Sequence, residues 1–186
     1  MEKMLLKSTT RHVRIFTAEV VDKELQFHPN KLTLDLDPDN EFIWNEDSLA
    51  KINDKFNELI ISVEDDHLVI KNDNEKLLDF FNSLKKDNKF NLLSSVTSVD
   101  YMSKFVVVYH LTSIEKNESI VIKIPCGESR IEPSIISVTS VWRGAELQER
   151  EIYDLMGIYF HNHPNMKRLL LWENFDGHPL RKDFVS

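Results

Sequence analysis

Alternating apolar and polar residues in the middle of the chain predict three β-strands, at residues 90–101, 105–114 and 119–125. In the last two strands the apolar residues recur at every second position and share one face: Phe105, Val107, Tyr109, Leu111, Ile120, Ile122 and Ile124. The connections at residues 100–104 and 115–118 are short and polar. We therefore expect neighbouring strands to pair as antiparallel hairpins.

Apolar residues at helical spacing predict one helix before these strands and one after them. A short strand at residues 68–70 precedes the first helix, which Asn72 or Asp73 can cap. The apolar stripe of this helix consists of Leu77, Leu78, Phe80, Phe81 and Leu84. A loop at residues 127–133 precedes the second helix, which ends at Gly157 and whose stripe consists of Val141, Ala145, Ile152, Leu155 and Met156. The order β-α-β-β-β-α with an extended tail predicts an α+β fold, a two-layer antiparallel sheet with packed helices.

The first third of the chain shows a separate pattern. Alternation predicts strands at residues 11–21 and 32–36, joined by a turn at residues 28–30 into a β-hairpin. Asn45 can then cap a helix whose apolar stripe consists of Leu49, Ile52, Phe56, Leu59 and Ile60. A small β-hairpin plus helix segment is therefore expected to precede the α+β fold.

Four acidic residues follow the hairpin and raise the question of a calcium site: Asp35, Asp37, Asp39 and Glu41. A helix-loop-helix calcium loop needs a glycine at its sixth position, and here Pro38 stands in a stretch without glycine. A capped turn is the simpler interpretation.

Composition excludes several classes of function. The formal net charge of −8 argues against nonspecific binding to nucleic acid, which requires a basic surface. A single cysteine, Cys126, excludes an intramolecular disulfide and any all-cysteine iron-sulfur or zinc site, and we expect it to be a buried strand-end thiol. The chain contains neither a P-loop nor a dinucleotide fingerprint. No apolar run approaches the roughly eighteen residues of a membrane span, so any membrane role is expected to depend on partners.

The densest chemistry lies between residues 149 and 184. Arg150 stands four positions from both Glu146 and Asp154, so its guanidinium can be held between two carboxylates on the helix side opposite the apolar stripe. Loss of Arg150 would then leave a carboxylate unpaired. The alternative is a solvated helix face of little energetic consequence. The aromatic, leucine-rich and basic segment that follows needs a surface to lie on, which indicates recognition.

Metal binding and catalysis are the competing interpretations of this segment. His161, His163, His178 and Cys126 could be imagined as ligands, but the usual zinc spacings are absent, and capping or packing is the commoner use of such histidines. Acid/base catalysis could use the carboxylates of Glu149, Glu151 and Asp154. No nucleophile, glycine-rich loop or positioned histidine accompanies them.

The segment at residues 149–184 resembles the sequence of a known family, the 30 kDa subunit of complex I, which is designated C in bacteria and J in the photosynthetic form. The similarity rests on Glu149-Arg150-Glu151, Asp154-Leu155-Met156, His163, Lys167 and Leu169-Leu170, and on the run from Trp172 through Gly177-His178-Pro179-Leu180-Arg181-Lys182-Asp183-Phe184.

The resemblance implies a non-catalytic scaffold subunit in the hydrophilic arm of a proton-translocating NAD(P)H (or ferredoxin):quinone oxidoreductase. It implies docking onto the 49 kDa-like quinone-site subunit, and a peripheral location on the cytoplasmic or stromal face of a thylakoid or plasma membrane. NAD(P)H, quinone and iron-sulfur clusters would belong to other subunits. The implied subunit interface consists of Glu149, Arg150, Glu151, Tyr153, Asp154, Tyr159, Phe160, His163, Pro164, Lys167, Arg168, Trp172, His178, Arg181, Lys182 and Phe184.

A second resemblance covers about residues 4–60, which look like the beginning of subunit M of the cyanobacterial and plastid NAD(P)H dehydrogenase-like complex. It rests on Leu5-Leu6-Lys7-Ser8-Thr9-Thr10-Arg11-His12-Val13-Arg14-Ile15-Phe16 and Leu32-Thr33-Leu34-Asp35-Leu36-Asp37-Pro38-Asp39-Asn40-Glu41-Phe42. The expected organisation is a subunit M-like segment at 1–61 and a 30 kDa subunit-like domain at 62–186. The latter divides into a core at 62–157 and an interaction tail at 158–186. Two alternatives stay open: an equivalent scaffold subunit of a membrane-bound hydrogenase or formate hydrogenlyase, and a free-standing metal-dependent enzyme.

Overall fold

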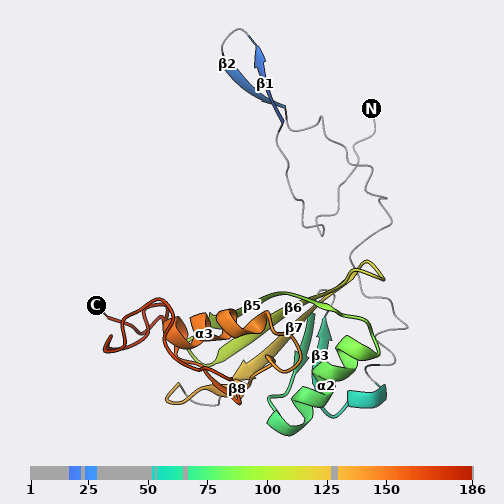
Figure 1. Ribbon diagram of the computed structural model, residues 1–186, viewed down its shortest axis with the longest axis vertical. Helices are drawn as coiled ribbons and strands as arrows, with labels where there is room; N and C mark the ends of the chain where they lie inside the picture. The colour runs from blue at the N-terminus through green and yellow to red at the C-terminus, as the bar shows by residue number, and fades with distance from the viewer. Residues whose placement is uncertain are drawn as a thin grey trace. The chain divides into compact units, whose positions relative to one another are not determined.

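The computed structural model describes residues 17–21, 24–28, 52, 54–64, 67–126 and 130–185. It separates into two compact units, Met1–Glu41 and Phe42–Ser186 (Figure 1).

The first unit contains an antiparallel β-hairpin, formed by β1 (Thr17–Val21) and β2 (Glu24–His28). A hairpin was expected here, but its turn was placed wrongly. The register pairs Val21 with Glu24, so the chain reverses before the predicted turn at residues 28–30. The predicted second strand at residues 32–36, the acidic cluster, and the Asn45 cap lie outside the described residues.

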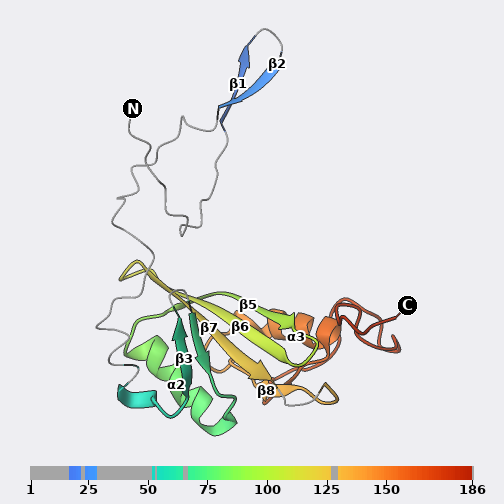
Figure 2. The same cartoon turned by 180° about the vertical axis from the view of Figure 1, so that it is seen from behind.

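The second unit is built on a five-stranded sheet in the order β3-β4-β7-β6-β5 (Figures 1 and 2). Its strands are β3 (Ile60–Glu64), β4 (His67–Ile70), β5 (Leu92–Asp100), β6 (Phe105–Ser113) and β7 (Glu118–Cys126). The three middle strands of the sequence pair antiparallel as predicted, because their connections are short. Strand β4 instead pairs parallel with β7, and the alternation pattern did not predict β3.

Helix α2 (Asn74–Lys86) forms where predicted. The side chain of Asp73 accepts hydrogen bonds from the backbone N–H groups of Glu75 and Lys76, which satisfies two of the free donors at the helix start. Its buried face packs aromatic rings on the sheet, with Phe81 in contact with Tyr109 of β6 and with Trp142. Before β3, Ile52 and Leu59 of the predicted stripe are buried, but Leu59 lies in a turn at residues 57–59 and not in a helix. Ile60, however, is the first residue of β3, so the helical pattern stops earlier than expected.

Helix α3 (Ala145–Met156) ends as predicted at Gly157, which adopts the left-handed conformation with a φ of 70°. Two short strands flank it, β8 (Ser134–Ile136) and β9 (Tyr159–His161), and they pair parallel with each other. The first residues of the tail are therefore a strand. On the sheet side, the side-chain oxygen of Gln148 accepts a hydrogen bond from Val96 N at 2.6 Å and so covers part of the outer edge of β5.

The apolar residues of both helices and of β6 and β7 form one core. The predicted α+β class is confirmed, with a sheet that is mainly antiparallel. Cys126 is buried at the end of β7, as expected, and burial raises the pKa of its thiol to about 12. Within the part of the chain that the structure describes, no helix is long and apolar enough to cross a membrane.

Candidate docking site on helix α3 and the tail

Asp154 is the centre of the contacts between α3 and the tail, residues 158–186. Its side chain is fully buried, and one carboxylate oxygen accepts hydrogen bonds from the backbone N–H groups of Leu169, Leu170 and Leu171 at 3.0, 2.7 and 2.9 Å. The other oxygen pairs with Arg168 Nη1 at 2.8 Å. Burial alone would raise the pKa of Asp154, but these donors outweigh it and lower the pKa to about 2.

Arg150 does not bridge two carboxylates, so that prediction was wrong. Its guanidinium donates to the backbone carbonyl oxygens of Lys167 at 3.1 Å and Arg168 at 2.9 Å. The cation that pairs with Asp154 is Arg168. The physical reason is that the tail lies on this helix face and brings carbonyl groups that need donors. The alternative of a solvated helix face is also wrong, because Arg150 is only 9% exposed and Asp154 0%.

Two further side chains hold the tail against the C-terminal end of α3. Arg181 donates to the carbonyl oxygens of Met156 at 2.6 Å and Gly157 at 3.2 Å, which places a cation at the negative end of the helix dipole. His178 Nδ1 donates to the carbonyl oxygen of Asp154 at 2.9 Å, and the pKa of this histidine is lowered, chiefly by burial. A side chain at Gly157 would overlap Arg181 and His178, so a glycine is required here for space as well as for its φ.

A second ionic cluster holds the end of the tail on the sheet. Arg130 forms a two-pronged pair with Asp100, at 2.6 and 2.9 Å, and also pairs with Asp183 of the tail at 2.7 Å. Asp100 is buried and additionally accepts a hydrogen bond from Lys182 N at 3.0 Å. The Arg130 hydrogen bonds hold the pKa of Asp100 well below its usual range. Sequence reasoning missed Asp100 and Arg130, because nothing in the local pattern links residues so far apart along the chain.

Glu149 occupies the interior beside the tail. One of its oxygens accepts from the Ser137 hydroxyl at 2.6 Å and the other from Val138 N at 2.8 Å. Burial raises the pKa of Glu149 to about 7, opposed by these two hydrogen bonds. His163 of the tail is buried next to it and donates from Nε2 to the carbonyl oxygen of Glu146 at 3.0 Å.

The predicted interface residues therefore fall into groups. Those that face the interior are Glu149, Arg150, Asp154, Phe160 and the side chain of His163. Those at intermediate exposure are Tyr153, Arg168, His178, Arg181 and Phe184. Those that are exposed are Glu151, Tyr159, Pro164, Lys167, Trp172 and Lys182. Three more exposed apolar side chains of the tail stand outside this set of interface residues: Leu170, Leu180 and Val185, which are 64%, 60% and 89% exposed.

Aromatic stacking supports the exposed part of the tail. Phe175 lies between Trp172, at a ring distance of 4.8 Å, and Phe184, at 6.1 Å. Arg168 also donates to the carbonyl oxygens of Phe175 and Gly177 at 2.8 and 3.1 Å. Trp172 remains 67% exposed, so this arrangement fixes a large apolar side chain that its own chain does not cover.

The histidines that could be imagined as metal ligands serve other contacts. His161 contacts Tyr159 edge-on at a ring distance of 5.3 Å, while His163 and His178 bind different backbone carbonyl groups. Among the described residues, no group of three or more His, Cys, Asp or Glu side chains could hold a metal ion.

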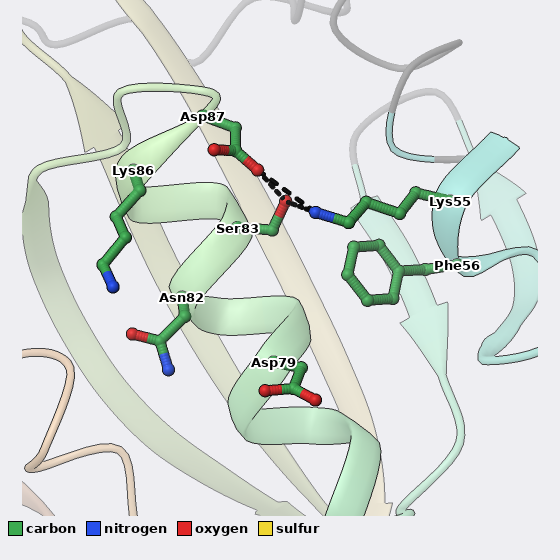
Figure 3. Close-up of a pocket in the computed structure, with 7 residues that line it drawn as sticks. All are labelled: Lys55, Phe56, Asp79, Asn82, Ser83, Lys86 and Asp87. Atoms are coloured by element: carbon green, nitrogen blue, oxygen red, sulfur yellow. Dashed lines mark hydrogen bonds and ion pairs between the residues drawn. The ribbon is translucent and has the colours of Figure 1, made fainter.

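A shallow hollow lies elsewhere, between α2 and the segment before β3 (Figure 3). Lys55 Nζ is 3.2 Å from both Ser83 Oγ and Asp87 Oδ2, so the cation and carboxylate on its wall satisfy each other. Phe56, Asp79, Asn82 and Lys86 complete the lining. Ser83 Oγ donates to Asp87 Oδ2 at 2.7 Å, so its hydroxyl belongs to the same closed group of contacts.

Comparison with known protein families gives a match for most of this chain. Residues 70–186 match the family described as "Respiratory-chain NADH dehydrogenase, 30 Kd subunit", and residues 3–72 match the family of "Cyanobacterial and plastid NDH-1 subunit M". The NADH-quinone oxidoreductase subunit of Geobacter sulfurreducens that is designated C is 38% identical over 146 residues, which covers 75% of this chain and 89% of that protein. NAD(P)H-quinone oxidoreductase subunit M of Prochlorococcus marinus (strain MIT 9215) is 95% identical over 60 residues, or 32% of this chain. The chain spans about half of that relative's length, 52%.

Solved structures agree with these matches. A trypsin-resistant fragment of Nqo5 superposes with a TM-score of 0.52 at 25% identity, covering 63% of this chain and 98% of that one. A chain of the membrane-bound sulfane sulfur reductase, an archaeal respiratory membrane complex, gives a TM-score of 0.60 at 26% identity, covering 75% of this chain and 85% of that one. Both resemblances inferred from the sequence are confirmed. The chain belongs to the family of the 30 kDa subunit of respiratory-chain NADH dehydrogenase, and it carries in front of that domain a segment that matches subunit M.

Proposed function

We propose that this chain is a non-catalytic scaffold subunit of a complex I-type quinone oxidoreductase, and that it docks onto the 49 kDa-like quinone-site subunit through its tail. The observation that carries the proposal is a tail whose exposed apolar side chains are held in place by buried ionic contacts to α3 and the sheet. The relatives that share the family are named as subunits of NADH-quinone oxidoreductases.

The geometry of the tail supports docking because the docking side chains are already ordered. Asp154 fixes three consecutive backbone N–H groups at residues 169–171, so Leu170 and Trp172 point away from their own core. A segment that is ordered before it binds loses less conformational entropy on association. Exposed tryptophan and leucine side chains supply apolar area, and Trp is enriched among the residues that dominate interface energies.

In this proposal the chain supplies position and not chemistry. NAD(P)H, quinone and iron-sulfur clusters are bound by other subunits, and the membrane is reached only through them. The buried carboxylates of Asp100 and Asp154 form ion pairs with Arg130 and Arg168. These ion pairs stabilise the fold and do not have the arrangement of a catalytic acid and base.

The segment at 1–61 is proposed as a second attachment to the same complex. Residues 3–72 match a family of one subunit of an NAD(P)H-quinone oxidoreductase, and residues 70–186 match the family of another subunit. Two weak attachments in one chain bind more tightly than either alone when both sites can be reached at once.

A second candidate is the equivalent scaffold position in a membrane-bound complex of the hydrogenase or formate hydrogenlyase type. The similarity to a chain of the membrane-bound sulfane sulfur reductase supports it, since that complex is described as an archaeal respiratory membrane complex that reduces sulfane sulfur. The subunit M match favours the quinone-reducing complex. A free-standing metal-dependent enzyme is the third possibility, and elemental analysis of the purified chain tests it directly: a stoichiometric metal would support it.

Affinity purification of the tagged full-length chain, with identification of the co-eluting proteins, tests the docking proposal. Trp172→Ala is expected to lower recovery of the quinone-site subunit at least tenfold, because it removes the large exposed anchor without touching the core. Ile114→Ala is the matched control, since Ile114 is 74% exposed but lies in the turn after β6, outside the tail.

Equal recovery with the Trp172 variant and the wild-type chain would contradict docking through the tail. Co-elution with hydrogenase subunits in place of quinone reductase subunits would identify the second candidate as the correct one.

A further inference from the structure

Glu149 is a buried acid whose neighbours come from several parts of the fold. It is 0% exposed, and its hydrogen-bond donors, Ser137 and Val138, follow strand β8. From the tail, His163 Nε2 lies 4.0 Å from Glu149 Oε2. That ring nitrogen donates to Glu146 O, and Nδ1 accepts from Asn165 N at 3.0 Å. The ring therefore carries its one proton on Nε2 in this arrangement and is neutral.

A chain of hydroxyl groups links Glu149 to the surface. Glu149 Oε2 is 2.6 Å from Ser137 Oγ, which in turn is 2.8 Å from Thr139 Oγ1. Ser137 is buried, whereas Thr139 is partly exposed. Both spacings are those of good O–H···O hydrogen bonds, so the three groups form one connected path from the interior to solvent.

This path can satisfy Glu149 in either charge state. When the carboxylate is ionised, Thr139 donates to Ser137 and Ser137 donates to Glu149. When it is protonated, Glu149 Oε2–H donates to Ser137 and Ser137 donates to Thr139, while Val138 N continues to donate to the other oxygen. Reversal of the two hydroxyl groups therefore preserves the hydrogen bonds that a buried polar group requires.

We infer that Glu149 is a buried proton-binding site, and that Ser137 and Thr139 pass its proton to and from solvent. Uptake is balanced as follows: a hydronium ion of the solvent gives a proton to Thr139 Oγ1 and becomes water, Thr139 releases its own proton to Ser137 Oγ, and Ser137 releases its own to Glu149 Oε2. Each hydroxyl ends with one proton, and the charge of Glu149 changes from −1 to 0.

The charges around Glu149 are consistent with a proton exchanged near neutral pH. Burial raises the pKa of Glu149 to about 7. From β6, Tyr109 faces the site with a buried hydroxyl; burial and then the charge of Glu149 raise its pKa, and Cys126 of β7 adds to this. The guanidinium of Arg150 is directed to tail carbonyl groups, and that of Arg168 to Asp154 and tail carbonyls. These two arginines are thus engaged elsewhere.

Carboxyl carbon NMR of the full-length chain as a function of pH tests this inference. We expect one glutamate signal to titrate with a midpoint near 7, and to be missing in Glu149→Gln. The amide signal of Val138 is expected to move with the same midpoint, because its acceptor changes charge. A Glu149 midpoint near the ordinary value of 4.5 would overturn the proposal.

Two variants distinguish proton exchange through the hydroxyl groups from an effect of burial alone, since they shift the titration midpoint of Glu149 in opposite directions. Ser137→Ala removes a hydrogen bond that favours the ionised form, so the midpoint rises. Thr139→Val leaves Ser137 without an acceptor in the protonated state, so the midpoint falls. Glu151→Gln, an exposed carboxyl on the same helix, is the matched control and is expected to leave the midpoint unchanged. Shifts in the same direction, or no shift in the Thr139 variant, would refute the role of the hydroxyl path. The wild-type and Thr139→Val titrations decide the question if Glu149→Gln does not fold.

Discussion

Replacement of Asp154 by asparagine tests the central contact between α3 and the tail while keeping the size of the side chain. If the amide oxygen takes the place of the oxygen that binds residues 169–171, the NH₂ group faces Arg168, and two donors meet. If the amide is turned the other way, the three backbone N–H groups face a donor instead. Neither orientation preserves the site.

The expected loss can be estimated in two ways. The pKa of Asp154 falls from its ordinary value of 3.8 to about 2 in the folded chain. At about 1.36 kcal/mol per pKa unit, this corresponds to roughly 2.5 kcal/mol of stabilisation by the ionised carboxylate. Breaking a buried ion pair by removing one partner typically costs about 3–5 kcal/mol, because the other charge is left uncompensated. We therefore expect Asp154→Asn to lower the free energy of unfolding by about 3 kcal/mol.

The same contact predicts a pH dependence with a definite sign. Because the folded pKa is lowered, this stabilisation is fully present above about pH 4 and is lost as the pH falls towards 2. In the asparagine variant this part of the acid dependence is expected to disappear.

Urea unfolding followed by circular dichroism gives the free energy, and hydrogen exchange at the amides of residues 169–171 gives the local effect. Glu151→Gln serves as the control, because Glu151 is an exposed acid on the same helix. A loss below about 1 kcal/mol with these three amides still protected would refute the reasoning, because this is less than the cost of one orphaned buried donor.

Two further substitutions test the other contacts that attach the tail to the rest of the domain. Arg130→Ala leaves the buried Asp100 without its cation and is expected to lower the free energy of unfolding by about 3 kcal/mol in urea titrations. Lys104→Ala, in the exposed turn before β6, is the control and is expected to have little effect. Equal stabilities of the two variants would disprove the role of the cluster. Gly157→Ala is expected to lower the melting temperature by several degrees, corresponding to more than about 1 kcal/mol, because the site has a φ of 70° and an added Cβ overlaps Arg181 and His178. An unchanged melting temperature in calorimetry would contradict this. Gly144→Ala is the control, because a Cβ added at Gly144 meets no atom within 4 Å apart from those of Gly144 and its two chain neighbours.

The sequence predicted several local features of the structure correctly. The alternation from Phe105 to Leu111 and from Ile120 to Ile124 fixed two strands and their buried faces, and the short polar connections fixed their antiparallel pairing. Asp73 before an apolar stripe marked the start of α2, and Gly157 marked the end of α3. These features depend on contacts between residues a few positions apart, so the chain encodes them directly.

The sequence also marked the segment from Glu149 to Phe184 as unusual, but it could not assign its partners. Arg150 had two carboxylates at helical spacing, yet it binds tail carbonyls, and Asp154 takes Arg168 from beyond the end of the helix. Spacing along a helix says which side chains can meet, whereas the tail competes for the same groups only after it has folded back.

Only the tertiary structure decided the parallel pairing of β4 with β7, the attachment of the tail at Asp154, and the cluster of Asp100, Arg130 and Asp183. The sequence by itself determined β5, β6, β7 and α2, the buried faces of β6 and β7, the end of α3 and the family. The physical reason is that periodicity is a local property, while the choice among many possible Arg and Asp partners depends on which groups folding brings within hydrogen-bond distance and removes from water.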